Sequence, residues 1–305
     1  MKILLLGANG QVGFELARSL APLGELVQAT RSGTLPGGAA CAVGDLADTN
    51  ALAALLDRVA PDLVVNAAAY TAVDRAEDEE AQATRANGEA VGEIGRWAAA
   101  RGASVVHYST DYVFDGAGTR PYREGDAVAP LGAYGRSKLA GEEALRDSGA
   151  LHLNLRTAWV YGARGANFLR TMLRLARERD RLTIVADQRG APTPARLIAN
   201  ATAAALVQWL ARDDARRRAE SGTYHLVSAG VCTWHDFAGA IVGRAHAAGL
   251  IDREPEVAAI TTAQFPTKAR RPAYSVLDTS RLAATFGLHL PSWEEGLAGV
   301  IGELA

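Results

Sequence analysis

The sequence predicts an α/β fold in which helices cover both faces of a parallel sheet. Short apolar runs alternate with helical patterns along the chain, as parallel strands and their crossover helices do. The first run, residues 2–6, leads directly into a glycine-rich turn and a helical pattern. A tyrosine and a lysine four residues apart, Tyr134 and Lys138, share one helix face near the middle of the chain. These observations favour an open sheet with a ligand site at the carboxyl ends of its strands.

The composition is that of a globular protein. The 305 residues are 49% hydrophobic and 22% charged, and the formal net charge is −2. This balance gives no electrostatic reason to expect a nucleic acid or an anionic membrane as partner, and no apolar run is long enough for a transmembrane helix or a signal peptide. The two cysteines, Cys41 and Cys232, belong to no motif, so we expect buried free thiols and a cytoplasmic location.

A glycine-rich turn follows the first predicted strand. Gly7 suits a tight turn, Gly10 lets the backbone approach a pyrophosphate, and Gly13 lets the following helix pack close to the strand. The helix would point its free N–H groups at the phosphates. The spacing is G-x-x-G-x-x-G, and its context of strand, turn and helix predicts a dinucleotide site. We therefore expect a Rossmann-like, doubly wound parallel sheet.

Two charged residues at the ends of the next predicted strands can complete the dinucleotide site. Arg31 follows the strand expected over 25–30 and can meet a 2′-phosphate, which favours NADPH while leaving NADH possible. A solvent-exposed loop arginine is the alternative. Asp45 suits contact with the adenine amino group, but it or Asp48 can instead cap the helix expected over 50–59.

The strand that begins at Leu63 ends in small residues, Ala67, Ala68 and Ala69. Small side chains at the carboxyl end of a parallel strand leave room for a cofactor in the crevice of an open α/β sheet. We therefore expect these three alanines to line the same dinucleotide site as the glycine turn.

The strand expected over 103–108 delivers hydroxyl groups to the same edge of the sheet, among them Thr110. Tyr134 and Lys138 follow on a helix. A free phenol titrates near ~10, and an ammonium one turn away favours the phenolate and lowers that pKa. A hydroxyl, a phenol and an ammonium beside a nicotinamide form a complete set for carbonyl reduction by hydride transfer. Alone, the Tyr-x-x-x-Lys spacing also fits a surface helix with an amphipathic tyrosine.

Several sequence blocks resemble a known family and occur in its order. They are NAAAYTAVDRA (66–76), VHYSTDYVFDG (106–116), YGRSKLAGE (134–142), RTAWVY (156–161), DQRGAPT (187–193) and YHLV (224–227). With the glycine turn, they resemble the extended short-chain dehydrogenase/reductase family over essentially the whole chain, and within it the reductases of nucleotide sugars. The resemblance implies NAD(P)H-dependent hydride transfer to C4 of dTDP-4-dehydro-β-L-rhamnose, giving dTDP-β-L-rhamnose in the last step of making that sugar donor.

The resemblance also implies roles for individual residues. Tyr134 would protonate the C4 oxygen, Lys138 would bind the nicotinamide ribose, and Thr110 would hydrogen-bond the substrate oxygen. Asp111 and Trp159 would contact the substrate sugar. The cofactor would be lined by the segments already described, namely Gly10, Gln11 and Val12, Asp45 and Leu46, and Ala67, Ala68 and Ala69.

Two alternatives stay open. A reductase or epimerase of another nucleotide sugar would share these residues, and so would a cofactor-binding regulatory subunit, since the regulatory subunit of methionine adenosyltransferase is similar to these reductases. A 4,6-dehydratase fits less well. Dehydratases with this fold carry an acid directly after the Thr-Asp pair, whereas here Tyr112 follows Thr110 and Asp111. Elimination would therefore lack its obvious base.

We expect two lobes. The dinucleotide-binding domain would comprise residues 1–160 and about 186–215, and the substrate lobe about 161–185 and 216–305. In the second lobe a cluster of cations ends in Arg270 and Arg271 and fits a nucleotide diphosphate. We place Arg271 in the substrate site; an exposed basic loop is the alternative.

For some members the resemblance implies a magnesium ion bound between subunits through glutamates. Glu15 and Glu294 stand at plausible places, but the position that would supply a further ligand is Arg196, a cation that would repel a metal. Magnesium is therefore doubtful, and we expect a monomer or a homodimer without a shared metal.

Overall fold

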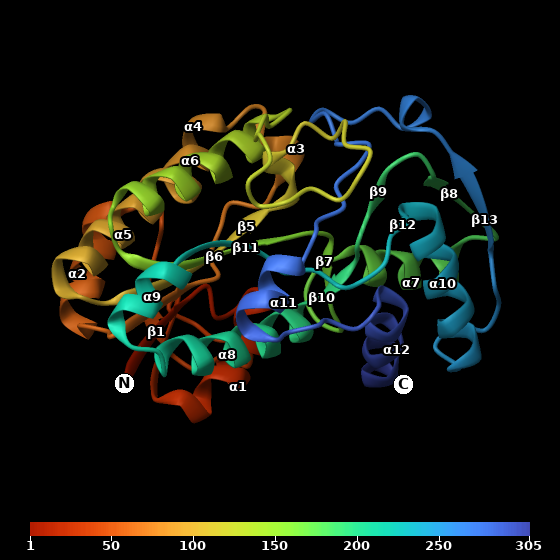
Figure 1. Ribbon diagram of the computed structural model, residues 1–305. Helices are drawn as coiled ribbons and strands as arrows, with labels where there is room; N and C mark the ends of the chain where they lie inside the picture. The colour runs from red at the N-terminus through yellow and green to blue at the C-terminus, as the bar shows by residue number, and fades with distance from the viewer.

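The computed structural model describes residues 1–305 and is built around a seven-stranded sheet (Figure 1). The spatial order is β11-β6-β5-β4-β1-β2-β3, and every pairing within the sheet is parallel. The strands are β1 (Lys2–Leu6), β2 (Glu25–Thr30), β3 (Ala42–Val43), β4 (Leu63–Asn66), β5 (Ser104–Thr110), β6 (Leu151–Thr157) and β11 (Gly222–His225). The doubly wound parallel sheet predicted from the sequence is confirmed.

Helices cover both faces of this sheet, which is why its central strands are apolar throughout. Ile3 and Leu5 of β1 contribute to the core on one face, and Leu4 and Leu6 contribute to the core on the other. The first face is covered by α1 (Gln11–Leu20), α8 (Ala195–Leu210) and α11 (Ser280–Phe286), and the second by α2 (Thr49–Val59), α5 (Ala90–Arg101) and α6 (Ala133–Asp147) (Figure 1).

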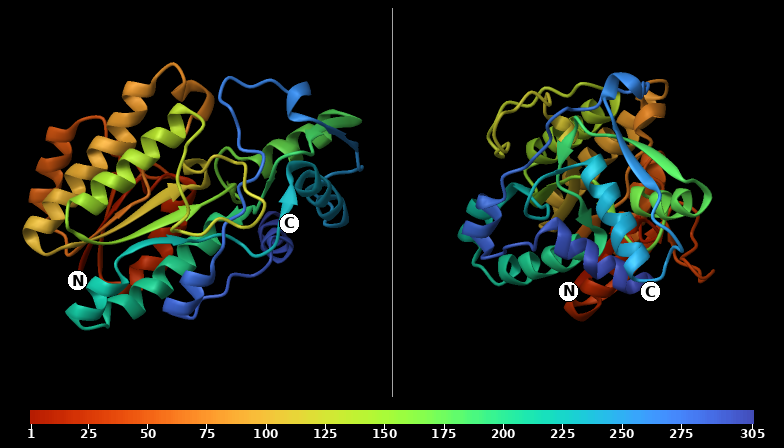
Figure 2. Two further views of the ribbon diagram at one scale, coloured as in Figure 1. Left: turned by 45° about the horizontal axis from the view of Figure 1, so that its top comes forward. Right: turned by 90° about the vertical axis from the view of Figure 1, so that its right-hand side faces the viewer.

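A second lobe with its own apolar core lies beyond the carboxyl ends of the strands, toward which the arrowheads of the sheet point in Figure 2. Met172, Phe237 and Leu297 are among its buried residues. The lobe is built from α7 (Phe168–Glu178), β8 (Arg181–Val185), α10 (Trp234–Ala247), β13 (Glu256–Ile260) and α12 (Trp293–Leu304), with β8 parallel to β13. Two short ladders pair β7 (Val160–Tyr161) with β10 (Thr193–Pro194), and β9 (Arg189–Gly190) with β12 (Cys232–Thr233).

Short helical elements complete the chain. The α-helical ones are α3 (Val73–Ala76), α4 (Glu80–Thr84) and α9 (Asp214–Glu220), and the 3-10 turns are η1 (Ala21–Leu23), η3 (Asp111–Val113) and η4 (Thr262–Gln264). A π turn, η2 (Arg85–Glu89), joins α4 to α5, so this run of helix has a widened turn within it. None of the helices combines the length and apolar character that crossing a bilayer requires.

The structure corrects the sequence analysis at three places. Residues 222–225, which we assigned to the substrate lobe, form the outer strand β11 of the large sheet beside β6. The strand expected to end in Ala67, Ala68 and Ala69 is shorter, since β4 ends at Asn66 and the three alanines follow it. Of the two free thiols, Cys232 is buried and Cys41 is half-buried. The place of residues 222–225 was not predicted because β11 pairs with β6, a strand far away in the sequence that no local pattern relates to it.

Candidate active site

The glycine turn packs tightly on one side and is open on the other. Gly7 has φ +78°, and a Cβ there would lie 2.6 Å from the backbone N of Ala68. A Cβ on Gly13 would lie 2.0 Å from the carbonyl oxygen of Gly7. Gly10 is the N-cap of α1, no side chain caps that end, and the nearest atom to a Cβ there is 3.3 Å away. The N–H groups at the start of α1 are therefore accessible to a phosphate group.

The segment after β4 is held in place by two buried asparagines. Oδ1 of Asn66 accepts from the N–H of Ala68 at 3.1 Å. Asn87 binds both backbone groups of Tyr70, at 2.8 and 3.0 Å, and donates to Oγ of Ser137 at 3.0 Å. Because Ser137 belongs to α6, Asn87 connects the predicted cofactor segment 67–69 with the helix of Tyr134 and Lys138.

Asn87 is a residue that the sequence analysis did not assign to the site. It lies in the π turn η2, which is a frequent location for functional residues. A Cβ on Gly141 of α6 would lie 2.0 Å from the carbonyl oxygen of Asn87, so the two helices are in close contact there. A polar residue that falls on the buried face of a helical pattern is the signal that could have identified it.

The structure distinguishes between the two roles considered for Asp45 and Asp48, which are contact with the adenine and capping of a helix. Asp48 caps α2, since its side chain accepts from the N–H of Ala51 at 2.9 Å. Asp45 accepts from the N–H of Ala47 at 2.9 Å within a tight turn and is half-buried, next to the buried Leu46. Arg31 is exposed at the end of β2, where its guanidinium is accessible to a ligand.

Thr110, Asp111 and Tyr134 meet at the carboxyl end of β5. Thr110 is the last residue of β5, and its Oγ1 donates to Oδ1 of Asp111 at 3.0 Å. Tyr134 lies in the first turn of α6, with its ring edge-on to Tyr112 at a centroid distance of 5.6 Å. Burial raises the pKa of Tyr134, and the hydroxyl of Thr110 opposes that rise.

Lys138 is buried, but its ammonium does not bind Tyr134. Its Nζ lies 2.6 Å from the carbonyl oxygen of Tyr108 and 3.1 Å from Nε2 of His107. Burial lowers the pKa of Lys138 to about 8. In this structure burial raises the pKa of Tyr134 and the ammonium of Lys138 makes no direct contact with the phenol, so the expected lowering of that pKa by Lys138 stays a prediction.

Asp111 presents an oxygen without a protein partner toward the site. The residue is 1% exposed, and its Oδ2 makes no hydrogen bond. Burial raises the pKa of Asp111 to about 6, although the nearby hydroxyl groups of Ser275 and Thr110 lower it in part. A buried carboxylate with one free oxygen suits a ligand that donates a hydroxyl group.

Trp159 is held in a strained conformation. Its φ is +48°, in the left-handed region that a bulky residue rarely adopts. Its indole stacks on Trp234 with centroids 3.6 Å apart and planes at 6°. On Gly190 a Cβ would lie 2.5 Å from the Trp159 ring, so the absence of a side chain there makes room for it. Such strain is common at ligand sites and fits the predicted sugar contact.

Of the two late arginines, Arg271 is the one that lies near the predicted site, where it contacts Asp74 and Tyr112. Its Nη2 lies 2.9 Å from Oδ2 of Asp74, and its Nη1 lies 3.4 Å from the hydroxyl of Tyr112. Arg270 is exposed. Since Tyr112 packs against Tyr134, the guanidinium of Arg271 is one side chain away from the tyrosine predicted to be catalytic.

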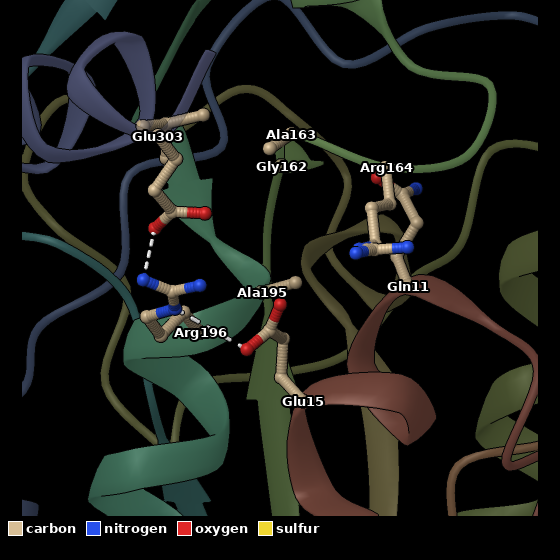
Figure 3. Close-up of a pocket in the computed structure, with 9 residues that line it drawn as sticks. Gln11, Glu15, Gly162, Ala163, Arg164, Ala195, Arg196 and Glu303 are labelled. Atoms are coloured by element: carbon tan, nitrogen blue, oxygen red, sulfur yellow. Dashed lines mark hydrogen bonds and ion pairs between the residues drawn. The ribbon is translucent and has the colours of Figure 1, made fainter. Parts of the chain in front are cut away.

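Glu15, one of the two glutamates considered for magnesium, lies beside the guanidinium of Arg196, and Glu303 lies on the other side of that guanidinium (Figure 3). Nε of Arg196 lies 3.3 Å from Oε2 of Glu15, and its Nη1 lies 2.5 Å from Oε1 of Glu303. Glu294, which we had expected near Glu15, is exposed and does not pair with Arg196. A divalent cation between Glu15 and Glu303 would meet a like charge, so these residues do not fit a metal.

A doubly wound sheet, an open glycine turn and a threonine, tyrosine and lysine at the carboxyl edge define an oxidoreductase of the short-chain dehydrogenase/reductase class. The family described as the RmlD substrate binding domain matches residues 1–305. The chain belongs to this family, and the family resemblance stated from the sequence is confirmed.

Individual relatives match over the whole chain. A dTDP-4-dehydrorhamnose reductase from Burkholderia thailandensis is 49% identical over 306 residues, which cover 100% of this chain and 99% of the relative. The crystal structure of a dTDP-4-dehydrorhamnose reductase from Clostridium acetobutylicum aligns with a TM-score of 0.86 at 34% identity and covers 100% and 99% of the two chains. One from Bacillus anthracis, in complex with NADP, aligns with a TM-score of 0.85 at 31% identity and covers 99% of each chain.

Proposed function

We propose that this chain is a dTDP-4-dehydrorhamnose reductase, which reduces C4 of dTDP-4-dehydro-β-L-rhamnose to give dTDP-β-L-rhamnose. The observation that carries the proposal is the cluster of Thr110, Asp111 and Tyr134 at the carboxyl end of β5, with Lys138 one helical turn from Tyr134. This cluster lies in a chain that is 49% identical to a reductase of that name over its full length.

The residues around the glycine turn fit a nicotinamide dinucleotide. Gly10, Gln11 and Val12 offer backbone N–H groups to its pyrophosphate, and Ala67, Ala68 and Ala69 lack the side-chain bulk that would exclude it. Asp45 and Leu46 would lie at its adenine. Arg31 would pair with a 2′-phosphate, so we propose NADPH as the preferred cofactor and NADH as the poorer one. When bound, the reduced cofactor supplies the hydride that the reaction requires.

The chain's own residues handle the proton and the orientation of the sugar. Tyr134 gives the proton that arrives at the C4 oxygen, and Thr110 turns its hydroxyl away from Asp111 to donate a hydrogen bond to the same oxygen. Lys138, when charged, favours loss of that proton from Tyr134. Transfer to an alkoxide is favourable even from a phenol with a raised pKa, because an aliphatic alcohol is a weaker acid still.

The substrate lobe would hold the sugar and its nucleotide. Asp111 would accept from a sugar hydroxyl through its free Oδ2, and Trp159 would present its ring to the sugar. Arg271 would pair with the diphosphate. We further propose that residues 161–185 and 226–305, apart from α11, form most of this lobe, and that the enzyme works in the cytoplasm as a monomer or a homodimer.

The direct test supplies enzymatically generated dTDP-4-dehydrorhamnose and follows the loss of reduced-nicotinamide absorbance with NADPH and NADH in parallel. We expect rapid oxidation with dTDP-rhamnose as product, and a higher kcat/KM with NADPH. Tyr134→Phe should fold and bind NADPH but lose turnover by at least about 100-fold, because it removes the proton donor. A folded wild-type protein that binds NADPH and oxidises none of it would contradict the proposal.

A further inference from the structure

The cation of the site, Lys138, has an unusual partner. Its side chain is 2% exposed, and apart from the carbonyl oxygen of Tyr108 its amine contacts Nε2 of His107 at 3.1 Å. Glu142, one turn further along α6, raises the pKa of Lys138 from a distance, but both of its oxygens bind Arg156. A buried histidine therefore stands where a counter-ion would be expected.

The proton on His107 can be assigned from its neighbours. Nδ1 of His107 lies 3.2 Å from Nδ2 of Asn66, and Oδ1 of Asn66 accepts from the N–H of Ala68 at 3.1 Å. Because a backbone N–H can only donate, the carboxamide of Asn66 has one orientation, and its Nδ2 donates to Nδ1 of His107. A neutral imidazole carries one proton, which must then sit on Nε2 and point at Lys138.

This arrangement constrains the lysine. An ammonium can only donate, so an Nε2–H opposite an ammonium would place two donors against each other. Neither the amide of Ala68 nor the carboxamide of Asn66 titrates near neutral pH. His107 cannot relieve the conflict by gaining a proton, since burial, the charge of Lys138 and the nearby His152 hold its pKa well below the ordinary value. The conflict disappears when Lys138 is a neutral amine that accepts from Nε2–H.

We propose that His107 is a positioning residue of the catalytic centre, which holds the amine of Lys138 through Nε2–H and couples the protonation of that amine, through Asn66, to the cofactor segment 67–69. The catalytic consequence rests on the proposed function, whereas the hydrogen-bond chain does not. Because charged Lys138 helps Tyr134 to release its proton, His107 sets the pH above which this help is lost.

The charged and titratable groups around His107 and Lys138 do not change the assignment of their protons. Glu142 from α6 is ionised and neutralised by Arg156 of β6. His152 from β6 is largely buried, and burial lowers its pKa, so it is neutral above mildly acidic pH. Asn66 from β4 carries no charge. Between about pH 7 and 9, Lys138 is therefore the group of this cluster that titrates, near the pKa of about 8 that its burial produces.

Two variants separate the two hydrogen bonds of His107. The terminal amide of glutamine reaches the position of Nε2 and can turn its oxygen toward Lys138, whereas the shorter asparagine reaches the position of Nδ1 and keeps the bond to Asn66 alone. For His107→Gln we expect a folded enzyme with kcat within about tenfold of wild type and a basic limb of the kcat profile moved up by about one pH unit, because the oxygen favours the ammonium. For His107→Asn we expect kcat to fall by more than about tenfold at every pH, because Lys138 loses its side-chain support.

A structural role alone would lower the melting temperature of both variants and leave the pH profile of the active fraction unchanged. An unshifted basic limb in folded His107→Gln would overturn the inference. If the wild type itself fails to turn over, the proposed function fails, and the inference is decided by a second measurement that needs no turnover.

That second measurement is the nitrogen NMR spectrum of protein labelled with ¹⁵N-histidine, with the signal of His107 identified by its loss in His107→Gln. We expect the Nε2–H tautomer at neutral pH and no protonation of this ring as the pH falls through the ordinary histidine pKa. The Nδ1–H tautomer, or titration of His107 near its ordinary pKa, would contradict the proposed hydrogen-bond chain.

Discussion

Arg156 of β6 and Glu142 of α6 form a two-point ion pair inside the protein. Nε of Arg156 lies 2.9 Å from Oε1 of Glu142, and Nη2 lies 2.6 Å from Oε2. Both side chains are more than nine-tenths buried, at 6% and 4% exposure, and the guanidinium also lies over the ring of Phe114. The pair joins α6, the helix that carries Tyr134 and Lys138, to β6 of the sheet beneath it.

We predict that Arg156→Met lowers the free energy of unfolding by about 3–5 kcal/mol, because it leaves the carboxylate of Glu142 buried without a partner. Urea unfolding followed by circular dichroism measures this loss. The double variant Arg156→Met with Glu142→Leu should recover much of it, since no charge is then left in the interior. Equal losses for the single and double variants would contradict this account.

The exposed pair of Arg174 and Glu178 is a matched control. Its side chains are 61% and 50% exposed, so Arg174→Met should lower the free energy of unfolding by under about 1 kcal/mol.

The stability that the buried pair of Arg156 and Glu142 contributes should also depend on pH. Burial would raise the pKa of Glu142, but the hydrogen bonds and charge of Arg156 lower it overall. The stability that Glu142 contributes is therefore present above its ordinary pKa and is lost as the pH falls through its lower folded-state pKa.

The packing of the glycine turn predicts opposite outcomes for alanine substitutions at Gly10 and Gly13. Gly10→Ala should fold with a free energy of unfolding within about 1 kcal/mol of wild type, because its Cβ meets no atom closer than 3.3 Å. It should still weaken NADPH binding by at least about tenfold, because the new methyl group points where the pyrophosphate would approach the backbone. Titration of NADPH fluorescence measures this effect.

Gly13→Ala, by contrast, should fail to fold or should lose more than about 3 kcal/mol, because its Cβ would lie 2.0 Å from the carbonyl oxygen of Gly7. Gly239→Ala, in an open position of α10, serves as the control and should be neutral or stabilising by about 1 kcal/mol. Normal stability of Gly13→Ala would show that the turn is less tightly packed than described.

Signals that act over a few residues were enough to predict much of the fold. The strand over 25–30 has the expected bounds, and the helix expected over 50–59 spans Thr49–Val59 with Asp48, one of the two candidates, as its N-cap. These elements are specified by apolar periodicity and by hydrogen bonds to near neighbours, both of which are readable in the chain.

Contacts between distant segments and the effects of burial were not predictable in the same way. The pairing of β8 with β13 and the contact of Arg196 with Glu303 join segments that no local pattern relates. The neighbours of Lys138 show the same limit. Its spacing from Tyr134 predicts proximity along a helix, whereas the hydrogen bond to His107 depends on how α6 sits on β5, and the raised pKa of Tyr134 depends on its burial.

Asp111 is predicted to make KM for the nucleotide sugar rise at acidic pH. Its pKa is raised to about 6, so the carboxylate that would accept from the sugar is lost as the pH falls below that value. We expect KM for the nucleotide sugar to rise about tenfold per pH unit below about pH 6, with kcat changing less. Asp111→Asn should raise KM at pH 7.5 by roughly tenfold to 100-fold and remove its rise at acidic pH.

The same residue should lower stability at neutral pH. A carboxyl group whose pKa is higher in the folded state than in the unfolded state favours folding when protonated, and that contribution disappears as the pH rises through about 6. Asp111→Asn is therefore expected to raise the melting temperature at pH 7.5 while it impairs substrate binding. A lower melting temperature together with an unchanged KM would contradict both roles of Asp111.

The Arg196 cluster predicts how the protein responds to divalent metals. Wild-type activity and melting temperature should be unchanged by EDTA and by added Mg²⁺, because a guanidinium lies between the carboxylates of Glu15 and Glu303. Arg196→Ala should lower the free energy of unfolding by roughly 1 kcal/mol, since Arg196 is partly exposed but Glu15 is nearly buried.

Arg196→Glu would bring three carboxylates together, and their repulsion should make this variant less stable than Arg196→Ala. Mg²⁺ or Mn²⁺ should then raise the melting temperature of Arg196→Glu but not that of Arg196→Ala, because only the former offers three carboxylate ligands to a hard cation. Loss of wild-type activity in EDTA that Mg²⁺ restores would show that a metal binds despite the guanidinium.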